Sequence, residues 1–408
     1  MTVGIYIQIP FCRTKCTYCN FHTGILSRGK DQPYVRAVCR EIRRSSGGAP
    51  ESAAGAQAAT AEGPQGLLGP GPAQAVDTIY LGGGTPSLLD GAALDGLIGA
   101  VRARFQVLPA AEVTLEADPE TVTGEKAAGW LSSGFNRISL GVQSFNDREL
   151  KSAGRMHRRE DIARSTDVLR EAGFSNISMD LIAGLPHQTR AAWDLSVAEL
   201  LALRPEHVSI YLLEIDEGSR LGQESLAGGT RYSAGAIPPD DAMADFYECA
   251  CERLARAGYQ HYEISNWALP GMHSRHNLKY WRREPYLGFG AGAHSFHSGV
   301  RWSNVHDPGR YVTCLDQAIS PRETSEEVTL EQALDEEFFL GLRQLEGIEL
   351  DRIESAYRGN GLGDRLRSRR ARIADLQQQG LVEFDGRRLR LAASRLTVSN
   401  EVFVALLE

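Results

Sequence analysis

The chain has 408 residues, 42% of them hydrophobic, and a formal net charge of −8. This composition is that of a folded globular protein, and the negative charge argues against a nucleic-acid partner held by bulk electrostatics. No apolar run approaches the roughly 20 residues of a membrane-spanning helix, and the N-terminus lacks the features of a secretory signal peptide, so we expect a cytoplasmic protein.

Runs of β-forming residues alternate with helical patterns along most of the chain. The expected strands span residues 5–10, 77–83, 112–118, 137–142, 176–182, 207–213 and 259–265. The expected helices span residues 31–45, 88–105, 159–172 and 240–257. This alternation predicts an α/β fold with a parallel sheet and right-handed crossovers. Because no Gly-x-Gly-x-x-Gly follows the first strand, the pattern favours an incomplete (βα)6 barrel over a dinucleotide-binding fold.

Changes in composition divide the chain into three expected parts. Residues 1–235 form the core barrel, which carries a low-complexity insertion rich in Gly, Ala and Pro at 46–75. Residues 236–320 extend the barrel, and residues 321–408 form a separate C-terminal domain. The insertion has no hydrophobic period and no residue pattern that indicates chemistry.

The C-terminal domain is predicted to resemble a winged helix. Helices over 335–345 and 369–379 precede a hairpin over 381–391, in which Asp385-Gly386 is a strong turn signal. A winged-helix shape with several arginines raises the hypothesis of DNA binding. The acidic run over 326–337 and the overall charge favour a solvated helix face or a docking surface instead. The arginines concerned are Arg365, Arg367, Arg369, Arg370 and Arg372.

Three of the seven cysteines lie within eight positions, just after the first expected strand. Cys12, Cys16 and Cys19 have the spacing C-x3-C-x2-C, which does not resemble a disulfide framework. Three thiolates can bind three irons of a [4Fe–4S] cubane and leave the fourth open. A zinc site would need a fourth ligand, and Asn20 and His22 are poor or uncertain ones. The other four cysteines are expected to be buried and inert, namely Cys39, Cys249, Cys251 and Cys314.

The sequence around these cysteines resembles a known superfamily. The run Tyr-Ile-Gln-Ile-Pro-Phe-Cys at 6–12, continued by the other two cysteines, is similar to radical-SAM proteins of the oxygen-independent coproporphyrinogen oxidase group. Further segments match in chain order at residues 81–87, 116–119, 141–143, 154–155 and 180–186. The resemblance covers nearly the whole chain apart from the insertion.

The resemblance implies that S-adenosylmethionine (SAM) chelates the open iron through its amino and carboxylate groups. It places Tyr6 near the methionyl part and Tyr18 near the adenine, and it implies that Glu116 accepts hydrogen bonds from SAM while Arg155 pairs with a carboxylate. Most of these residues fall near the C-terminal ends of expected strands, where barrel enzymes gather functional groups. The implied SAM residues are Tyr6, Tyr18, Gly83, Gly84, Thr85, Glu116, Gln143, Arg155 and Asp180.

Two features indicate one branch of this group. Phe21 occupies the position of a fourth cysteine in the oxidase branch, and His-Asn-Leu-Lys-Tyr-Trp at 276–281 is similar to an element of the HemW branch. Members of that branch resemble heme chaperones, which deliver heme to respiratory proteins. This implies heme as a ligand, heme-accepting proteins as partners and, where these are membrane-bound, peripheral contact with them. The alternative is an oxygen-independent coproporphyrinogen III oxidase.

His276 is the expected axial ligand of the heme iron, because a neutral imidazole is a common heme ligand. A solvent-accessible side chain would suit a protein that must release its heme. The competing interpretation is a histidine held by hydrogen bonds without any ligand. Three neighbours in sequence are alternative ligands, namely His273, His294 and His297.

Overall fold

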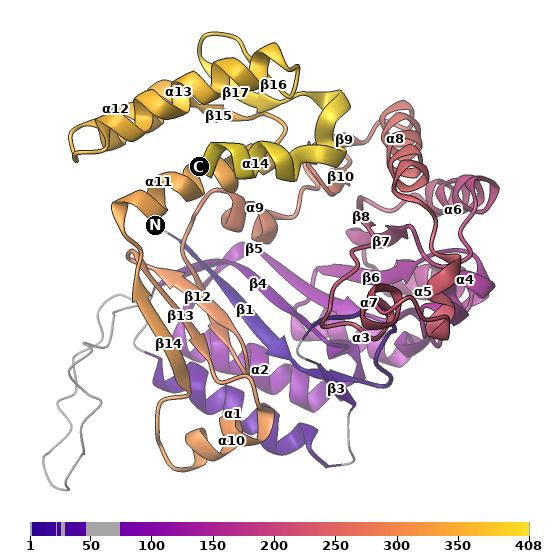
Figure 1. The fold of residues 1–408 in the computed structure, drawn as a ribbon. Coiled ribbons are helices and arrows are strands. Elements are labelled where there is room, and N and C mark those ends of the chain that lie inside the picture. The colour runs from indigo at the N-terminus through magenta and orange to yellow at the C-terminus, as the bar shows by residue number, and fades with distance from the viewer. Residues whose placement is uncertain (1, 22, 26–28, 46–73, 408) are drawn as a thin grey trace, which may run out of the picture.

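The computed structural model describes residues 2–21, 23–25, 29–45 and 74–407. The insertion expected at 46–75 lies outside the described residues except for its last two, and His22 also lies outside them. The described chain forms a twelve-stranded sheet that curves into an open barrel, with a smaller domain above it (Figure 1).

Six consecutive parallel strands form the barrel, and each expected strand is found within a few residues. They are β1 (Val3–Ile9), β4 (Ala75–Gly83), β5 (Gln106–Ala117), β6 (Arg137–Gln143), β7 (Ile177–Ala183) and β8 (His207–Leu212). They lie side by side in this order, and the far edge of β1 pairs with β11 (Tyr286–Phe289) instead of β8. The barrel is therefore incomplete, as predicted.

Helices cover the outer face of these strands (Figure 1). The helix over 159–172 was predicted with its observed ends, because Gly173 stops it in the left-handed conformation that glycine adopts without strain. The barrel helices are α1 (Asp31–Arg44), α2 (Gly91–Arg104), α3 (Gly124–Ser133), α4 (Asp147–Ser152), α5 (Arg159–Ala172), α6 (Arg190–Leu203), α7 (Arg220–Leu226) and α8 (Asp240–Arg256).

The strands alternate between apolar and polar residues. In β1, Ile5 and Ile7 are fully buried against the helices, whereas Tyr6 and Gln8 lie on the opposite face. The same period of two runs through the other five strands. A parallel sheet buried on both apolar faces would read as a continuous hydrophobic run. The alternation therefore fits a barrel with a helix-covered outside and a polar interior.

Both edges of the barrel sheet carry additional strands. The single strand expected over 259–265 is instead an antiparallel pair on β8, formed by β9 (Gln260–Glu263) and β10 (Asn266–Ala268). The chain then passes through α9 (Arg275–Trp281) to β11 and a set of strands that the sequence analysis missed. These are β12 (His294–His297), β13 (Val300–Asn304) and β14 (Arg322–Glu327), with α10 (Pro308–Asp316) between the last two.

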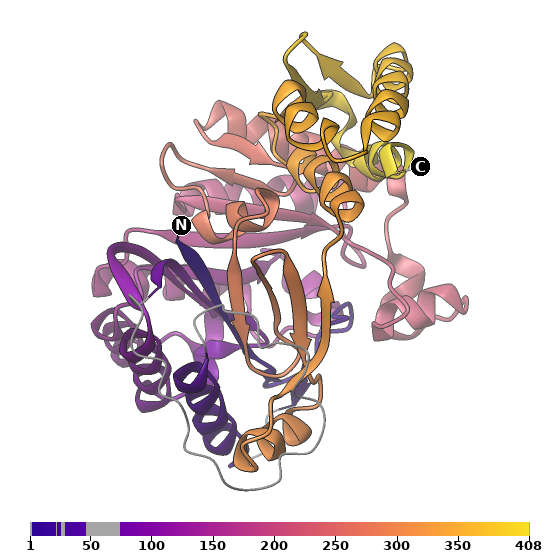
Figure 2. The ribbon, with the colours of Figure 1, turned by 90° about the vertical axis from the view of Figure 1, so that its left-hand side faces the viewer.

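The C-terminal domain has the element order of a winged helix. Its three-stranded sheet has the order β15-β17-β16, and the predicted hairpin is present with Gly386 at its turn. The expected helix over 335–345 begins earlier and ends at Phe339. The elements are α11 (Leu330–Phe339), β15 (Ile348–Glu349), α12 (Leu350–Arg358), α13 (Gly363–Gln378), β16 (Val382–Phe384), β17 (Arg388–Leu391) and α14 (Ser399–Leu407). Figure 2 shows this domain above one end of the barrel. The strand β14 pairs with β13, although it lies in the range expected for this domain.

Candidate functional site

A cavity of about 550 Å³ opens at the C-terminal ends of the parallel strands. Its volume lies within the range typical of small-molecule sites. It brings together the three motif cysteines and all of the predicted SAM residues except Tyr6. The cavity is lined, among others, by Cys12, Cys16, Cys19, Tyr18, Gly83, Gly84, Thr85, Glu116, Gln143, Arg155 and Asp180.

The cysteine loop is held in place by its backbone. Cys12 belongs to β2 (Phe11–Cys12), which pairs with β3 (Gly24–Ile25). The Thr17 amide donates to the Ala153 carbonyl at 3.0 Å, and the Leu221 amide of α7 donates to the Thr17 carbonyl at 2.8 Å. The loop is thus fixed between the end of α4 and the start of α7, so its thiols are placed before any ligand binds.

Two of the three thiols, those of Cys12 and Cys19, sit in an environment that opposes their ionisation. Burial raises the pKa of Cys12 to about 11 and also raises the pKa of Cys19. Positive charge from bound iron would reverse this effect. Among the described residues, no three His, Cys, Asp or Glu side chains converge closely enough to hold one metal ion. A cubane does not require such convergence, because each thiolate binds a different iron. The donor set therefore fits a [4Fe–4S] cluster.

The glycine loop packs directly against the cysteine segment. The Gly84 amide donates to the Ile9 carbonyl at 2.8 Å, and the Thr85 amide donates to the Phe11 carbonyl at 2.7 Å. A side chain at Gly84 would place its Cβ 2.7 Å from the Ile9 oxygen and still closer to that of Phe11. Glycine is therefore required for the approach of one chain segment to another. Gly83 and Gly84 also line the cavity, as the sequence analysis expected for contact with SAM.

Glu116 is a buried acceptor inside the barrel. Its carboxylate accepts hydrogen bonds from the Tyr80 hydroxyl at 2.8 Å and from the Gly83 amide at 3.0 Å. Burial raises the pKa of Glu116 to about 7, although both hydrogen bonds oppose the rise. Burial likewise raises the pKa of Asp180 to about 6. Both carboxyl groups titrate near neutrality, so either can accept or hold a proton in the cavity.

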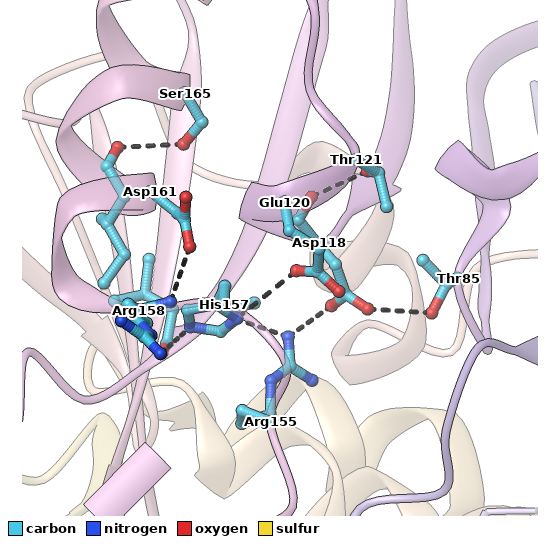
Figure 3. Close-up of polar contacts among 12 residues, drawn as sticks. Thr85, Asp118, Glu120, Thr121, Arg155, His157, Arg158, Asp161 and Ser165 are labelled. Carbon is cyan, nitrogen blue, oxygen red and sulfur yellow. Dashed lines mark hydrogen bonds and ion pairs between the residues drawn. The ribbon is translucent and has the colours of Figure 1, made fainter. Parts of the chain in front are cut away.

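Arg155 pairs with an acid of the protein itself, Asp118, which the sequence analysis did not single out (Figure 3). Its Nη2 also donates to the Gly141 carbonyl at 2.8 Å, and its Nη1 lies 3.5 Å from the Cys16 sulfur. Thr85 donates to the other oxygen of Asp118 at 3.1 Å. Asp118 belongs to the matched segment 116–119, which was the available signal. The guanidinium therefore connects the cluster loop to the ends of β5 and β6.

Comparison with known proteins agrees with these features. The Radical SAM superfamily matches residues 68–199, and the HemN C-terminal domain matches residues 328–393. The heme chaperone HemW of Bacillus subtilis is 33% identical over 405 residues, which cover 98% of this chain and 98% of that protein. HemW of Mycobacterium tuberculosis is 34% identical over 408 residues, with 99% and 94% coverage.

The chain belongs to the HemW family. A solved structure of Escherichia coli coproporphyrinogen III oxidase (HemN) has a TM-score of 0.81 at 22% identity and covers 99% of this chain and 90% of that one, which supports the shared fold. Membership of the radical SAM superfamily implies a [4Fe–4S] cluster and SAM. None of the described helices is long and apolar enough to cross a membrane.

His276, the expected heme ligand of this HemW-family chain, lies at the opposite end of the barrel from the cysteines. It is 1% exposed, so the expectation of a solvent-accessible side chain is wrong. Its Nδ1 lies 2.9 Å from the Thr78 hydroxyl and its Nε2 lies 2.8 Å from the Tyr280 hydroxyl. Burial lowers the pKa of His276 to about 3. Each ring nitrogen thus already has a partner.

The surrounding element closes the bottom of the barrel. The backbone amides of Arg275 and His276, in the first turn of α9, donate to the Glu112 carboxylate at 3.0 and 3.1 Å. Tyr6 lies in the same layer and stacks on Tyr80 with ring centroids 6.2 Å apart. The element at 276–281 therefore packs against the N-terminal ends of the strands, and Tyr6 lies in this layer and does not line the cavity.

The remaining candidates of the sequence analysis have ordinary surroundings. Of the four other cysteines only Cys39 is buried, and Cys249, Cys251 and Cys314 are half-buried, which corrects the expectation for these three. Four of the five C-terminal arginines form ion pairs with acids of their own domain. The pairs are Arg365–Glu331, Arg367–Asp364, Arg369–Asp335 and Arg370–Glu354. This pairing leaves little positive charge for a DNA backbone.

Proposed function

We propose that this chain binds heme and transfers it to heme-accepting respiratory proteins. The observation that carries the proposal is its similarity, over 98% of its length, to a protein named as a heme chaperone. We further propose that it acts in the cytoplasm and meets membrane-bound acceptors through peripheral contact.

Within this proposal, Cys12, Cys16 and Cys19 hold the cluster and the cavity residues hold SAM. When bound, the cluster supplies the electron for reductive cleavage of the SAM sulfonium. Glu116 accepts hydrogen bonds from a ribose hydroxyl or an amino group of SAM. Arg155 is fixed by Asp118 and keeps positive charge beside Cys16. The cavity walls limit the access of water to these groups.

The presence and exposure of Phe21 favour a chaperone function over an oxidase function. Its side chain is 65% exposed and lines the mouth of the cavity, where the oxidase branch carries a further cysteine. An exposed phenylalanine cannot bind iron, but it offers apolar contact to a ligand. The alternative of a coproporphyrinogen III oxidase rests on the shared fold, and fold alone does not determine function.

His276 can act as axial ligand in this proposal only if α9 moves. Ligation would break a hydrogen bond to Thr78 or Tyr280 and bring a buried ring to the surface. Among the alternatives, His294 is exposed on β12 and His273 is half-buried against Tyr262. The ligand is therefore best determined spectroscopically, with one His→Ala variant for each of these three positions.

One sample tests the proposal against its alternative. Anaerobically reconstituted protein is loaded with heme, mixed with an excess of a heme-depleted respiratory acceptor, and assayed in parallel with coproporphyrinogen III and SAM. We expect the acceptor to gain heme and coproporphyrinogen to remain unchanged. The Cys16→Ala variant is the control, because it should lose the cluster signal. Decarboxylation with consumption of SAM, and no heme transfer, would establish the oxidase instead.

A further inference from the structure

The cavity extends beyond the predicted SAM residues to the seam between the barrel and the C-terminal domain. On the barrel side this outer end is lined by Tyr211 of β8 and by Ile264 and Ser265 between β9 and β10. On the other side it is lined by Arg343 at the end of η5 (Gly341–Arg343) and by Leu396, Thr397, Ser399 and Asn400. Side chains of the barrel and of the C-terminal domain thus line the same cavity.

The outer end includes an uncovered aromatic ring among polar and aliphatic side chains. Tyr211 is 43% exposed, although it belongs to a barrel strand and lines the cavity. Aromatic rings at such positions provide a flat apolar surface for a planar ligand. The aliphatic side chains that line the cavity together with it are Ile182, Ile210, Leu212, Leu213, Ile264 and Leu396.

Arg343 carries the positive charge at the outer end of the cavity. Its guanidinium stacks on Trp281, with 4.5 Å from Cζ to the ring centroid. In the part of the chain that the structure describes, no carboxylate lies within ion-pair distance of Arg343, and its Nε is buried without a hydrogen-bond partner. Two other arginines at the same seam are paired, Arg282 with Glu346 and Arg283 with Glu336. Arg343 lines the cavity and forms no such ion pair, although its charge opposes the rise that burial causes in the pKa of Glu263.

We propose that the outer end binds the carboxylate-bearing edge of heme. Tyr211 and Leu396 contact the macrocycle, and Arg343 pairs with a carboxylate of the ligand. Arginine suits this task because its planar guanidinium binds carboxylates through two hydrogen bonds. The inference rests on the proposed heme binding and adds to it a location that both domains share. The C-terminal domain is then part of the ligand site.

The test compares heme with its dimethyl ester, which has the same macrocycle but no charged carboxylate. Arg343→Gln should weaken the binding of heme by about tenfold or more and leave ester binding within about twofold. Asn400→Glu, an exposed change on the cavity side of α14, should act in the same direction by repelling the carboxylates. This second variant leaves the contact between Arg343 and Trp281 in place, so a loss of heme affinity in it cannot be attributed to lost packing on Trp281.

Matched controls come from the same seam and from the same helix, α14. Arg282→Gln removes a paired seam arginine that does not line the cavity, and Val404→Glu adds an acid on the exposed part of α14. Both should bind heme like the wild type. All four variants should keep the SAM-induced change in the spectrum of the reduced cluster.

The outcomes separate this site from the function it depends on. If the wild type binds heme, and Arg343→Gln and Asn400→Glu bind it equally well, the site is wrong while the function stands. Equal losses for heme and ester, or a parallel loss of SAM binding, would also overturn the carboxylate contact. If the wild type binds no heme, the proposed function itself fails and this site fails with it.

Discussion

His157 and Glu120 face each other behind the ion pair of Arg155 and Asp118, with 3.6 Å between Nδ1 of the ring and Oε2 of the carboxylate (Figure 3). The other ring nitrogen of His157 lies 3.0 Å from the Val142 carbonyl oxygen. His157 therefore lies between the end of β6 and the carboxylate of Glu120. Burial raises the pKa of Glu120, but His157, the Glu120 backbone amide and Arg155 together outweigh it and the net pKa is lowered.

This relationship predicts that His157 is a positioning residue for the cavity. Val142 lies between Gly141, which accepts from Arg155, and Gln143, which has a positive φ of 65°. His157→Phe should destabilise the protein by about 1–3 kcal/mol, because it leaves a buried carbonyl and a carboxylate unsatisfied. It should also weaken SAM binding, measured by titration of the reduced cluster. Unchanged SAM affinity would restrict His157 to a role in stability.

The hydrogen bond from Tyr80 to Glu116 predicts a pH dependence of SAM binding. Glu116 has a pKa of about 7, so below that pH it is protonated and accepts hydrogen bonds less well. SAM affinity should therefore fall as the pH decreases through about 7. Tyr80→Phe removes a bond that lowers this pKa, so the midpoint should move to higher pH. A midpoint that stays in place would show that another group controls the profile.

Because Glu41 is buried, we expect the stability of the folded protein to depend on pH, independently of the groups in the cavity. This buried carboxylate of α1 accepts from the Gly290 amide, the Asn304 amide and the Tyr311 hydroxyl at 2.9, 2.6 and 2.5 Å. Burial raises its pKa from 4.5 to about 7. Its stabilising contribution is complete below about pH 4.5 and is lost as the pH rises through about 7.

The comparison with Glu41→Gln isolates this effect. The variant cannot ionise, so the wild type should lose Tm relative to it when the pH is raised from about 5 to about 8. Thermal unfolding followed by circular dichroism at several pH values measures the difference. Parallel curves for the two proteins across this range would contradict the assignment.

The glycine loop predicts a sharp difference between two glycine substitutions. Gly84→Ala places a methyl group against the backbone oxygens of Ile9 and Phe11 and should cost about 1–3 kcal/mol. The displaced cysteine segment should then bind less iron after reconstitution. Gly96→Ala is the control, because a Cβ at this position of α2 meets no atom within 4 Å. The control should be neutral or slightly stabilising. Equal iron content in both variants would contradict the proposed packing role.

The sequence predicted the barrel, and the strand pattern also predicted that the candidate site residues lie close together. Cys12, Gly83 and Glu116 lie at or near strand ends, and parallel strands bring their C-terminal ends to one edge, so residues far apart in sequence converge there. The barrel strands were recognisable in the sequence because apolar residues recur at every second position. The strand β14 was not recognisable in this way, because its residues 322–327 are polar and mostly exposed. It forms by pairing with β13.

The role of His276 could not be decided from the sequence alone. A histidine beside aromatic residues is compatible with a heme ligand and with a buried, hydrogen-bonded ring. The deciding partner, Thr78, lies 198 residues away in the chain, and only the folded barrel brings the two together. Arg343 was missed for the same reason, since its exposure to the cavity depends on how the C-terminal domain contacts β8 and β10.

We propose that this chain binds heme while it carries a cluster on Cys12, Cys16 and Cys19. The most direct measurement is a heme titration of the anaerobically reconstituted protein, followed by Soret absorbance in the presence of SAM. We predict saturable binding of about one heme per chain at about four irons per chain. A titration that shows no saturable heme binding by cluster-loaded protein would contradict the account.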